Sequence, residues 1–203
     1  MKIPSKNDCL RLMCQAQMLE HIVAHSLQVC RVGMCLVDYL KVKGNALDAR
    51  LVQAAALLHD ITKARSFETE ENHAQTGGEF LTDLGYAEVG NLVRQHVHLD
   101  NYPEPPQLSE AVIINYADKR VLHDRIVSLP DRMSYIQERY GTRLEHKDRI
   151  LSLWQKTTVL EQQMFKDLPF SADDLVLHLT PVDLSNEISN YQKVCSQIAT
   201  GSG

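Results

Sequence analysis

The sequence predicts an all-α fold, a helical bundle built around a metal site with additional C-terminal helices. Apolar residues recur with a 3.6-residue period along nearly the whole chain, helix stop and start signals separate these stretches, and strand patterns are hard to find. With 203 residues, 44% of them hydrophobic and 23% charged, the chain fits one globular domain with a substantial core. The same composition argues against extensive disorder.

Each predicted helix follows from its own periodic stretch and its own boundary signals. Gly44-Asn45 should end one helix and cap the next, Asn72 to Gln75 resembles a capping box, and Ser109 should cap a later helix. Residues 54–58 are apolar on all sides, which indicates a helix in the centre of the core. The first expected helix begins near residue 6, and the second carries His25. The following helices are expected at about 46–60, from 73 toward 84, at about 86–96, from 109 through 118, and from after Pro130 to Gly141.

The C-terminal part is expected to extend the same domain. We divide the chain into a metal-binding catalytic part, 1–141, a helical elaboration, 142–200, and a tail, 201–203, that could be a cloning remnant. Thr142 to Glu145 resembles another capping box and opens a helix toward Phe165, whereas residues 169 to 203 look less regular. The apolar stripe of that helix needs a partner surface, and we favour packing within the chain over a homodimer. The stripe consists of Ile150, Leu153, Trp154, Thr157, Leu160 and Met164.

Charge, apolar runs and cysteines narrow the class of protein further. The formal net charge of -5 gives no general attraction to nucleic acid polymers or anionic membranes, and no run of eighteen apolar residues is present. We therefore expect a cytoplasmic protein without a membrane or nucleic acid partner. The five cysteines are odd in number and contain no C-x-x-C pair, so we expect reduced thiols packed between helices.

Four polar residues lie on helix stripes that should face the core. His25 shares its stripe with Ile22 and Val29, and Asp118 shares one with Ile114 and Val121, while His73 and His96 fall on similar stripes. A buried carboxylate without a partner is costly, whereas a divalent cation bound among these groups would offset the desolvation of all of them. Any one of these histidines alone is more often a hydrogen-bonded core residue, with a chance of metal ligation of roughly one in ten.

The adjacent pair His59-Asp60 changes that balance. Both residues follow a buried helix and lie about 100° apart around its axis, so both can reach one point beyond the helix end. The order His25, His59-Asp60, Asp118 resembles the H…HD…D signature of the HD superfamily of metal-dependent phosphohydrolases, over roughly residues 20 to 125. The segment His-Asp-Ile-Thr-Lys, residues 59–63, is similar to the HDIG form of the motif, and Ala-Asp-Lys, 117–119, to the family's final motif.

The resemblance implies a ligand set and also shows departures. It implies that His25, His59, Asp60 and Asp118 bind one metal ion, and that His73 and His96 complete a second site with Asp60 as the bridge. Thr62 replaces the glycine of HDIG, and no GYP-type motif follows His96, which argues against a cyclic dinucleotide substrate. The cofactor would be one or two divalent ions of iron, manganese, zinc, nickel or cobalt, with magnesium also compatible.

The other histidines carry weaker signals. His98 lies about 200° around its helix from His96, on the polar face, and is expected at the rim of the site. A second pair, His123-Asp124, lies near a helix end beside Arg120 and Arg125, where we expect solvated side chains. The remaining histidines, His21, His146 and His178, are expected to be surface or partner-bonded residues.

The expected chemistry is hydrolysis of a phosphate ester by metal-bound hydroxide. Asp60, Lys63 and Asp118 are the candidate catalytic residues, and Lys63, Lys119 and Arg120 are candidate ligands of the substrate phosphate, although solvated surface charge explains Arg120 and Arg125 equally well. A small-molecule substrate, a nucleotide or related metabolite, is expected. Two alternatives remain: a di-iron oxygenase similar to the myo-inositol oxygenase family, and a sensor that binds a nucleotide without turnover.

Overall fold

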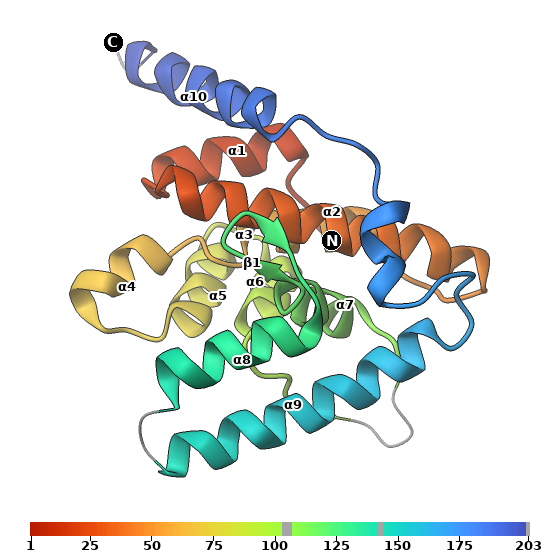
Figure 1. Cartoon of the computed structure of the whole chain (residues 1–203). Coiled ribbons are helices and arrows are strands. Elements are labelled where there is room, and N and C mark those ends of the chain that lie inside the picture. Colours follow the sequence, from red (N-terminus) through yellow and green to blue (C-terminus); the bar gives the residue numbers. More distant parts are fainter. Residues whose placement is uncertain (103–106, 142–143, 202–203) are drawn as a thin grey trace.

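The all-α prediction is confirmed by a computed structural model of the chain (Figure 1). The structure describes residues 1–102, 107–141 and 144–201, with the side chains of 144–146 left out, so the Pro-rich break at 103–106 and the capping box at 142–145 lie outside the described residues. The elements are α1 (Lys6–Gln15), α2 (Glu20–Val42), α3 (Ala49–Leu58), α4 (Lys63–Thr69), α5 (His73–Asp83), α6 (Ala87–Arg94), α7 (Glu110–Asp118), β1 (Val121–Leu122), β2 (Arg125–Ile126), α8 (Leu129–Tyr140), α9 (Leu144–Phe165), the 3-10 helix η1 (Asp173–His178) and α10 (Leu184–Thr200).

Helix α3 lies at the centre of the bundle, as its sequence predicts. Residues 54–58 are 0% exposed, and α3 packs against α1, α2, α6 and α7. Its start differs from the prediction: Asp48, not Asn45, caps it, because the Asp48 carboxylate accepts hydrogen bonds from the amides of Arg50 and Leu51. Asn45 instead donates its side-chain amide to the carbonyl of Leu40 at the end of α2.

Helices α5 and α6 approach each other closely at two glycines. A Cβ atom added at Gly78 would lie 2.7 Å from the carbonyl oxygen of Gly90, and one added at Gly90 would lie 2.4 Å from the carbonyl oxygen of Gly78. Only residues without a side chain permit this backbone contact. The contact matters for the site because His73 begins α5 and His96 follows α6.

Helix α9 packs within the chain, on α7 and α8. Its apolar side chains Ile150, Leu160 and Met164 are buried, so the stripe that raised the idea of a homodimer already has a partner surface. Between α7 and α8 the chain forms a short antiparallel hairpin, β1 and β2, which the sequence pattern did not reveal because each strand has two residues.

Helix α10 corrects two predictions about the C-terminal region. Residues 184–200 form a regular helix that packs on α1 and α2, although this region looked irregular in sequence. Cys14 of α1 and Cys195 of α10 form a disulfide, with their Cα atoms 5.3 Å apart, so the expectation of five reduced thiols is wrong. The other cysteines, Cys9, Cys30 and Cys35, are free. A count of cysteines does not reveal this pair because its members are 181 positions apart and meet only after folding.

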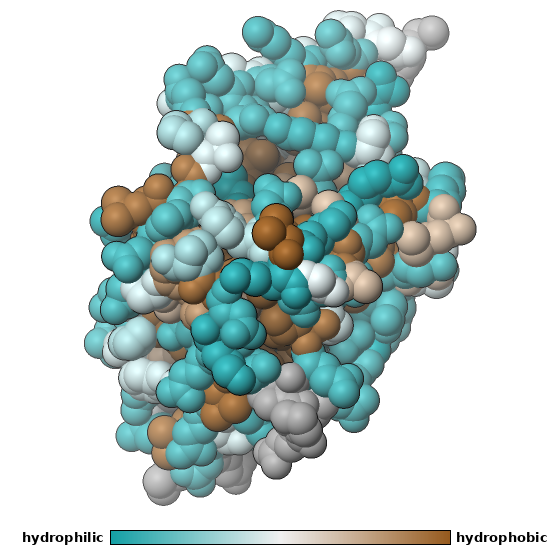
Figure 2. All heavy atoms as spheres, turned by 90° about the vertical axis from the view of Figure 1, so that its right-hand side faces the viewer, coloured by the Kyte–Doolittle hydropathy of each residue, from teal (hydrophilic) through white to brown (hydrophobic). Residues whose placement is uncertain are grey.

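The surface of the protein is mostly polar. Hydrophilic residues dominate the face shown in Figure 2, and hydrophobic residues are scattered over it in small groups. None of the helices in the described parts of the chain combines the length and the apolar character required to cross a bilayer.

Candidate metal centre

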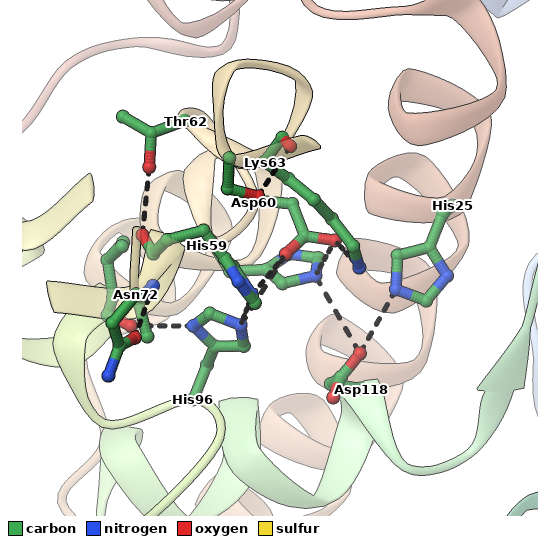
Figure 3. Close-up of polar contacts among 12 residues, drawn as sticks. His25, His59, Asp60, Thr62, Lys63, Asn72, His96 and Asp118 are labelled. Carbon is green, nitrogen blue, oxygen red and sulfur yellow. Dashed lines mark hydrogen bonds and ion pairs between the residues drawn. The ribbon is translucent and has the colours of Figure 1, made fainter. Parts of the chain in front are cut away.

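The six predicted metal ligands come together at one place in the bundle. Figure 3 labels five of them, His25, His59, Asp60, His96 and Asp118. His59 and Asp60 directly follow α3, His96 follows α6, and Asp118 is the last residue of α7. The C-terminal ends of three helices therefore converge here, and each contributes a partial negative charge that favours a cation. His25 projects from the middle of α2, and His73 from the first position of α5.

One cluster of ligand atoms consists of His25, His59 and Asp118, with Asp60 beside it. His25 Nε2 lies 3.0 Å from Asp118 Oδ1, His59 Nε2 lies 3.7 Å from the same oxygen, and His59 Nε2 lies 3.4 Å from Asp60 Oδ2. His59 is fully buried, whereas Asp118 keeps 14% of its side chain exposed.

A second cluster forms on the other oxygen of Asp60. His73 Nε2 lies 3.2 Å and His96 Nε2 lies 3.5 Å from Asp60 Oδ1, and the two ring nitrogens are 3.3 Å apart. Asp60 thus presents Oδ2 to the first cluster and Oδ1 to the second, which is the arrangement of a bridging carboxylate.

Backbone carbonyls orient three of the imidazoles. His59 Nδ1 donates to the carbonyl of Ala56 at 2.8 Å, His96 Nδ1 donates to that of Val93 at 2.7 Å, and His25 Nδ1 donates to that of His123 at 2.9 Å. A carbonyl oxygen can only accept, so each Nδ1 carries a proton. In the neutral ring this leaves the lone pair on Nε2, which faces the cluster, and metal-binding histidines are oriented in the same way.

The residues present fit a bound divalent metal. Two ligands about 2.0–2.2 Å from one ion, with an angle of about 90–120° between them, are about 3.0–3.7 Å apart, and the six separations above fall in that range. His59 Nε2 and Asp60 Oδ1 are buried, and neither atom has a hydrogen-bond partner among the described residues. Buried polar atoms without partners are costly, and a cation between them would satisfy both.

The pKa shifts describe a site that favours positive charge. Burial alone would raise the pKa of the Asp60 carboxyl, but His59 and Lys63 outweigh burial and hold it well below its usual range. Burial alone would lower the pKa of His59, but the negative charges of Asp60 and Asp118 outweigh it and raise that pKa. Burial lowers the pKa of His96, which favours the neutral ring that a metal requires.

Lys63 lies at the open side of the site. Its ammonium group donates to Asp60 Oδ2 at 2.7 Å, and 32% of its side chain is exposed. Thr62, which stands where HDIG has glycine, has an ordinary φ of -102°, so the turn does not require glycine. The Thr62 hydroxyl donates to the carbonyl of His73 at 2.9 Å and thereby ties the start of α5 to the start of α4.

Lys119 and Arg120 are placed differently from the other candidates. Both are buried at 2% exposure. The Lys119 ammonium bonds the carbonyl and side-chain oxygens of Asn115, and burial lowers its pKa to about 8. Arg120 donates to Tyr116, to the carbonyl of Val127 and to that of Ala172. Arg120 therefore helps to pack α7 against the C-terminal region. It is not a solvated charge, and because its donors are already bonded within the protein it is not free to receive a phosphate.

The other described histidines lie outside the clusters, and the side chain of His146 is not among the described residues. His21 and His98 are exposed, and His178 stacks on Phe170 with a centroid distance of 3.9 Å. The side chains of His123 and Asp124 are exposed as expected, but their backbone matters: the carbonyl of His123 accepts from His25. The sequence could not reveal this hydrogen bond, because a backbone carbonyl is present in every residue and is not marked by any residue type.

Comparison with known proteins agrees with this geometry. Residues 22–121 match the HD domain family, and the chain therefore belongs to the HD-domain proteins. An uncharacterized protein of Methanocaldococcus jannaschii is 28% identical over 66% of this chain and 86% of its own length. A tRNA (cytidine(56)-2'-O)-methyltransferase of Picrophilus torridus is 28% identical over 64% of this chain, and a ribonuclease Y of Acidothermus cellulolyticus is 30% identical over 75% of it.

The matched segment is only part of those two enzymes. The match covers 40% of the methyltransferase and 30% of the ribonuclease, so their names describe proteins with much additional sequence. No solved structure matches the chain significantly.

Proposed function

We propose that the chain is a metal-dependent phosphohydrolase that cleaves a phosphate ester of a small molecule, a nucleotide or a related metabolite. The observation that carries this proposal is the pair of ligand clusters that share Asp60, inside a segment that matches the HD domain family. A divalent metal, when bound, supplies an acidified water at neutral pH and a positive charge for phosphoryl oxygens.

The exposure of the ligands indicates the side from which a substrate approaches. His59, Asp60 and His96 are at most 2% exposed, whereas the side chains of Lys63 and His73 are 32% and 25% exposed. A phosphate entering on this side would meet the Lys63 ammonium, which attracts it and favours charge that develops on its oxygens. Asp118, the more exposed of the two carboxylates, would accept a proton from the attacking water.

A polymeric substrate is the second candidate. Several relatives are named ribonuclease Y, and one of them aligns over 75% of this chain. The net charge of -5 favours the small molecule, because a long RNA would meet general repulsion outside the site.

Metal analysis followed by substrate screening tests the proposal. We would measure the metal content of the purified protein, restore that metal or manganese after chelation, and assay release of phosphate or nucleotide from mononucleotides, other phosphate esters and a short RNA. The expected result is metal-dependent cleavage of a small ester that is lost in Asp60→Asn. If the protein cleaves the RNA but none of the small esters, the substrate class is RNA and not a small molecule. Substrate-dependent oxygen consumption, or tight nucleotide binding without product in a single turnover, would overturn the hydrolase in favour of the oxygenase or the sensor.

A further inference from the structure

Helix α8 brings an arginine toward the metal centre that the sequence patterns did not mark. The hairpin of β1 and β2 follows α7 and leads into α8, which lies alongside α9 (Figure 1). A chain of contacts joins this helix to the first ligand cluster. The carbonyl of His123 accepts from His25 at 2.9 Å, the rings of His123 and Tyr135 have centroids 5.6 Å apart, and the Arg132 guanidinium lies 5.7 Å from the centroid of the Tyr135 ring.

Electrostatics place the same guanidinium close to the charged groups of the site. The pKa of the Asp118 carboxyl lies well below its usual range: burial would raise it, but the hydrogen bond from His25 and the charge of Arg132 hold it down. Arg132 also acts on the pKa of Lys63, as a smaller influence after burial and Asp60. Its charge therefore acts on the partly exposed Asp118 and Lys63.

Among the described residues the guanidinium of Arg132 lacks an acceptor, in contrast to three arginines that are paired within the protein. Arg120 uses its three nitrogens, Arg94 pairs with Asp100, and Arg65 pairs with Glu71. Within the part of the chain that the structure describes, no oxygen accepts a hydrogen bond from Arg132, and its Nε atom is buried without a partner. The guanidinium lies over the ring of Tyr135, which holds it by a cation–π contact.

We propose that Arg132 binds the oxygens of the substrate phosphate, together with Lys63, in the space between α8 and the metal centre. A half-buried guanidinium without an acceptor is costly, and a phosphate offers the paired oxygens that its planar fork matches. This assignment rests on the proposed phosphohydrolase function, and it moves the phosphate-binding role from Arg120 and Lys119, whose donors are engaged inside the protein, to Arg132.

The test measures binding of inorganic phosphate and turnover in matched variants of the full-length, manganese-loaded protein. Arg132→Ala removes the guanidinium, Arg132→Lys keeps a charge without the fork, and Arg139→Ala removes an exposed arginine from the same helix as the control. We expect Arg132→Ala to weaken phosphate binding and kcat/KM for the best ester by about 10- to 100-fold. Arg132→Lys should fall in between, Arg139→Ala should match the wild type, and metal content and Tm should be unchanged in all three.

The outcomes separate this inference from the proposed function. Unchanged phosphate affinity in Arg132→Ala, or loss of metal from both Arg132 variants, would overturn the assignment even if the wild type is an active hydrolase. If the wild type cleaves no ester but Arg132→Ala still weakens phosphate binding relative to Arg139→Ala, the phosphate site stands and the hydrolase proposal fails. Should Arg132→Ala fold poorly, the comparison of Arg132→Lys with the wild type decides in the same way.

Discussion

Replacing Asp60 by asparagine should separate metal binding from folding. The carboxylate is 1% exposed and lies 2.7 Å from the Lys63 ammonium and 3.5 Å from His96 Nε2. An asparagine of nearly the same shape can still accept from Lys63, and its amide can donate to the lone pair of His96. Because Asp60 is buried, the lost charge-assisted contact is worth about 1.5–3 kcal/mol, and the new hydrogen bond returns about 1 kcal/mol, so we expect the unfolding free energy of the metal-free protein to fall by about 1–2 kcal/mol.

Stabilisation by metal should respond much more strongly. At a free metal concentration of 100 times Kd, binding to the folded state adds about 2.7 kcal/mol, or about 5–11 °C in Tm for a chain of this size. Removal of a partner outside the ligand shell already weakens metal binding by about 10- to 100-fold, and Asp60 contacts both clusters. With a Kd weakened 100-fold, the same concentration adds about 0.4 kcal/mol, or about 1 °C.

The assay is a thermal melt of wild type and Asp60→Asn, each in chelator and in manganese, with elemental analysis of both. Asp124→Asn is the matched control, because it alters the second His-Asp pair, whose side chains are exposed. Metal should raise the Tm of the Asp124→Asn control as much as it raises that of the wild type. A full metal-induced shift in Asp60→Asn, or a variant that is unfolded in chelator, would refute the assignment of Asp60 as a shared ligand that folding does not require.

Three further changes probe other parts of the molecule. Gly90→Ala places a Cβ atom 2.4 Å from the carbonyl oxygen of Gly78, so it should lower the unfolding free energy by about 1–3 kcal/mol and reduce the metal stoichiometry. Chemical denaturation and metal analysis measure these two quantities. Wild-type values for both would contradict the close approach of α5 and α6. Lys63→Ala should reduce turnover by about 10- to 100-fold while metal content stays intact, and loss of the metal would instead indicate a structural lysine. Reduction of the Cys14–Cys195 disulfide should cost about 2–4 kcal/mol in denaturation experiments, and alkylation followed by mass analysis should show two thiols that appear only after reduction.

Periodicity predicted most of the site because the ligands occupy helix stripes or helix ends. Residues 54–58 had to be a buried helix, so the position of His59-Asp60 beyond its end followed from the sequence. The cations were harder to place. Lys119 and Arg120 look like surface charges in sequence, yet both are buried, because their acceptors come from backbone carbonyls and from α9, which a residue pattern does not show.

The shared geometry of His59 and His96 explains why helix ends are suited to hold this site. Each histidine donates Nδ1 to the carbonyl three residues earlier, Ala56 and Val93, in the last turn of its helix. Both carbonyls lie in the last turn, where the regular amide partner four residues further on is missing, although the Val93 carbonyl also accepts from the amide of His96 at 3.2 Å. A histidine just beyond the helix end can therefore bond such a carbonyl and direct its Nε2 away from the helix. The helix end thereby fixes the tautomer, the ring direction and the sign of the local field together. A histidine in the middle of a helix lacks such a carbonyl, and His25 accordingly takes its acceptor from His123 in the hairpin 98 residues away.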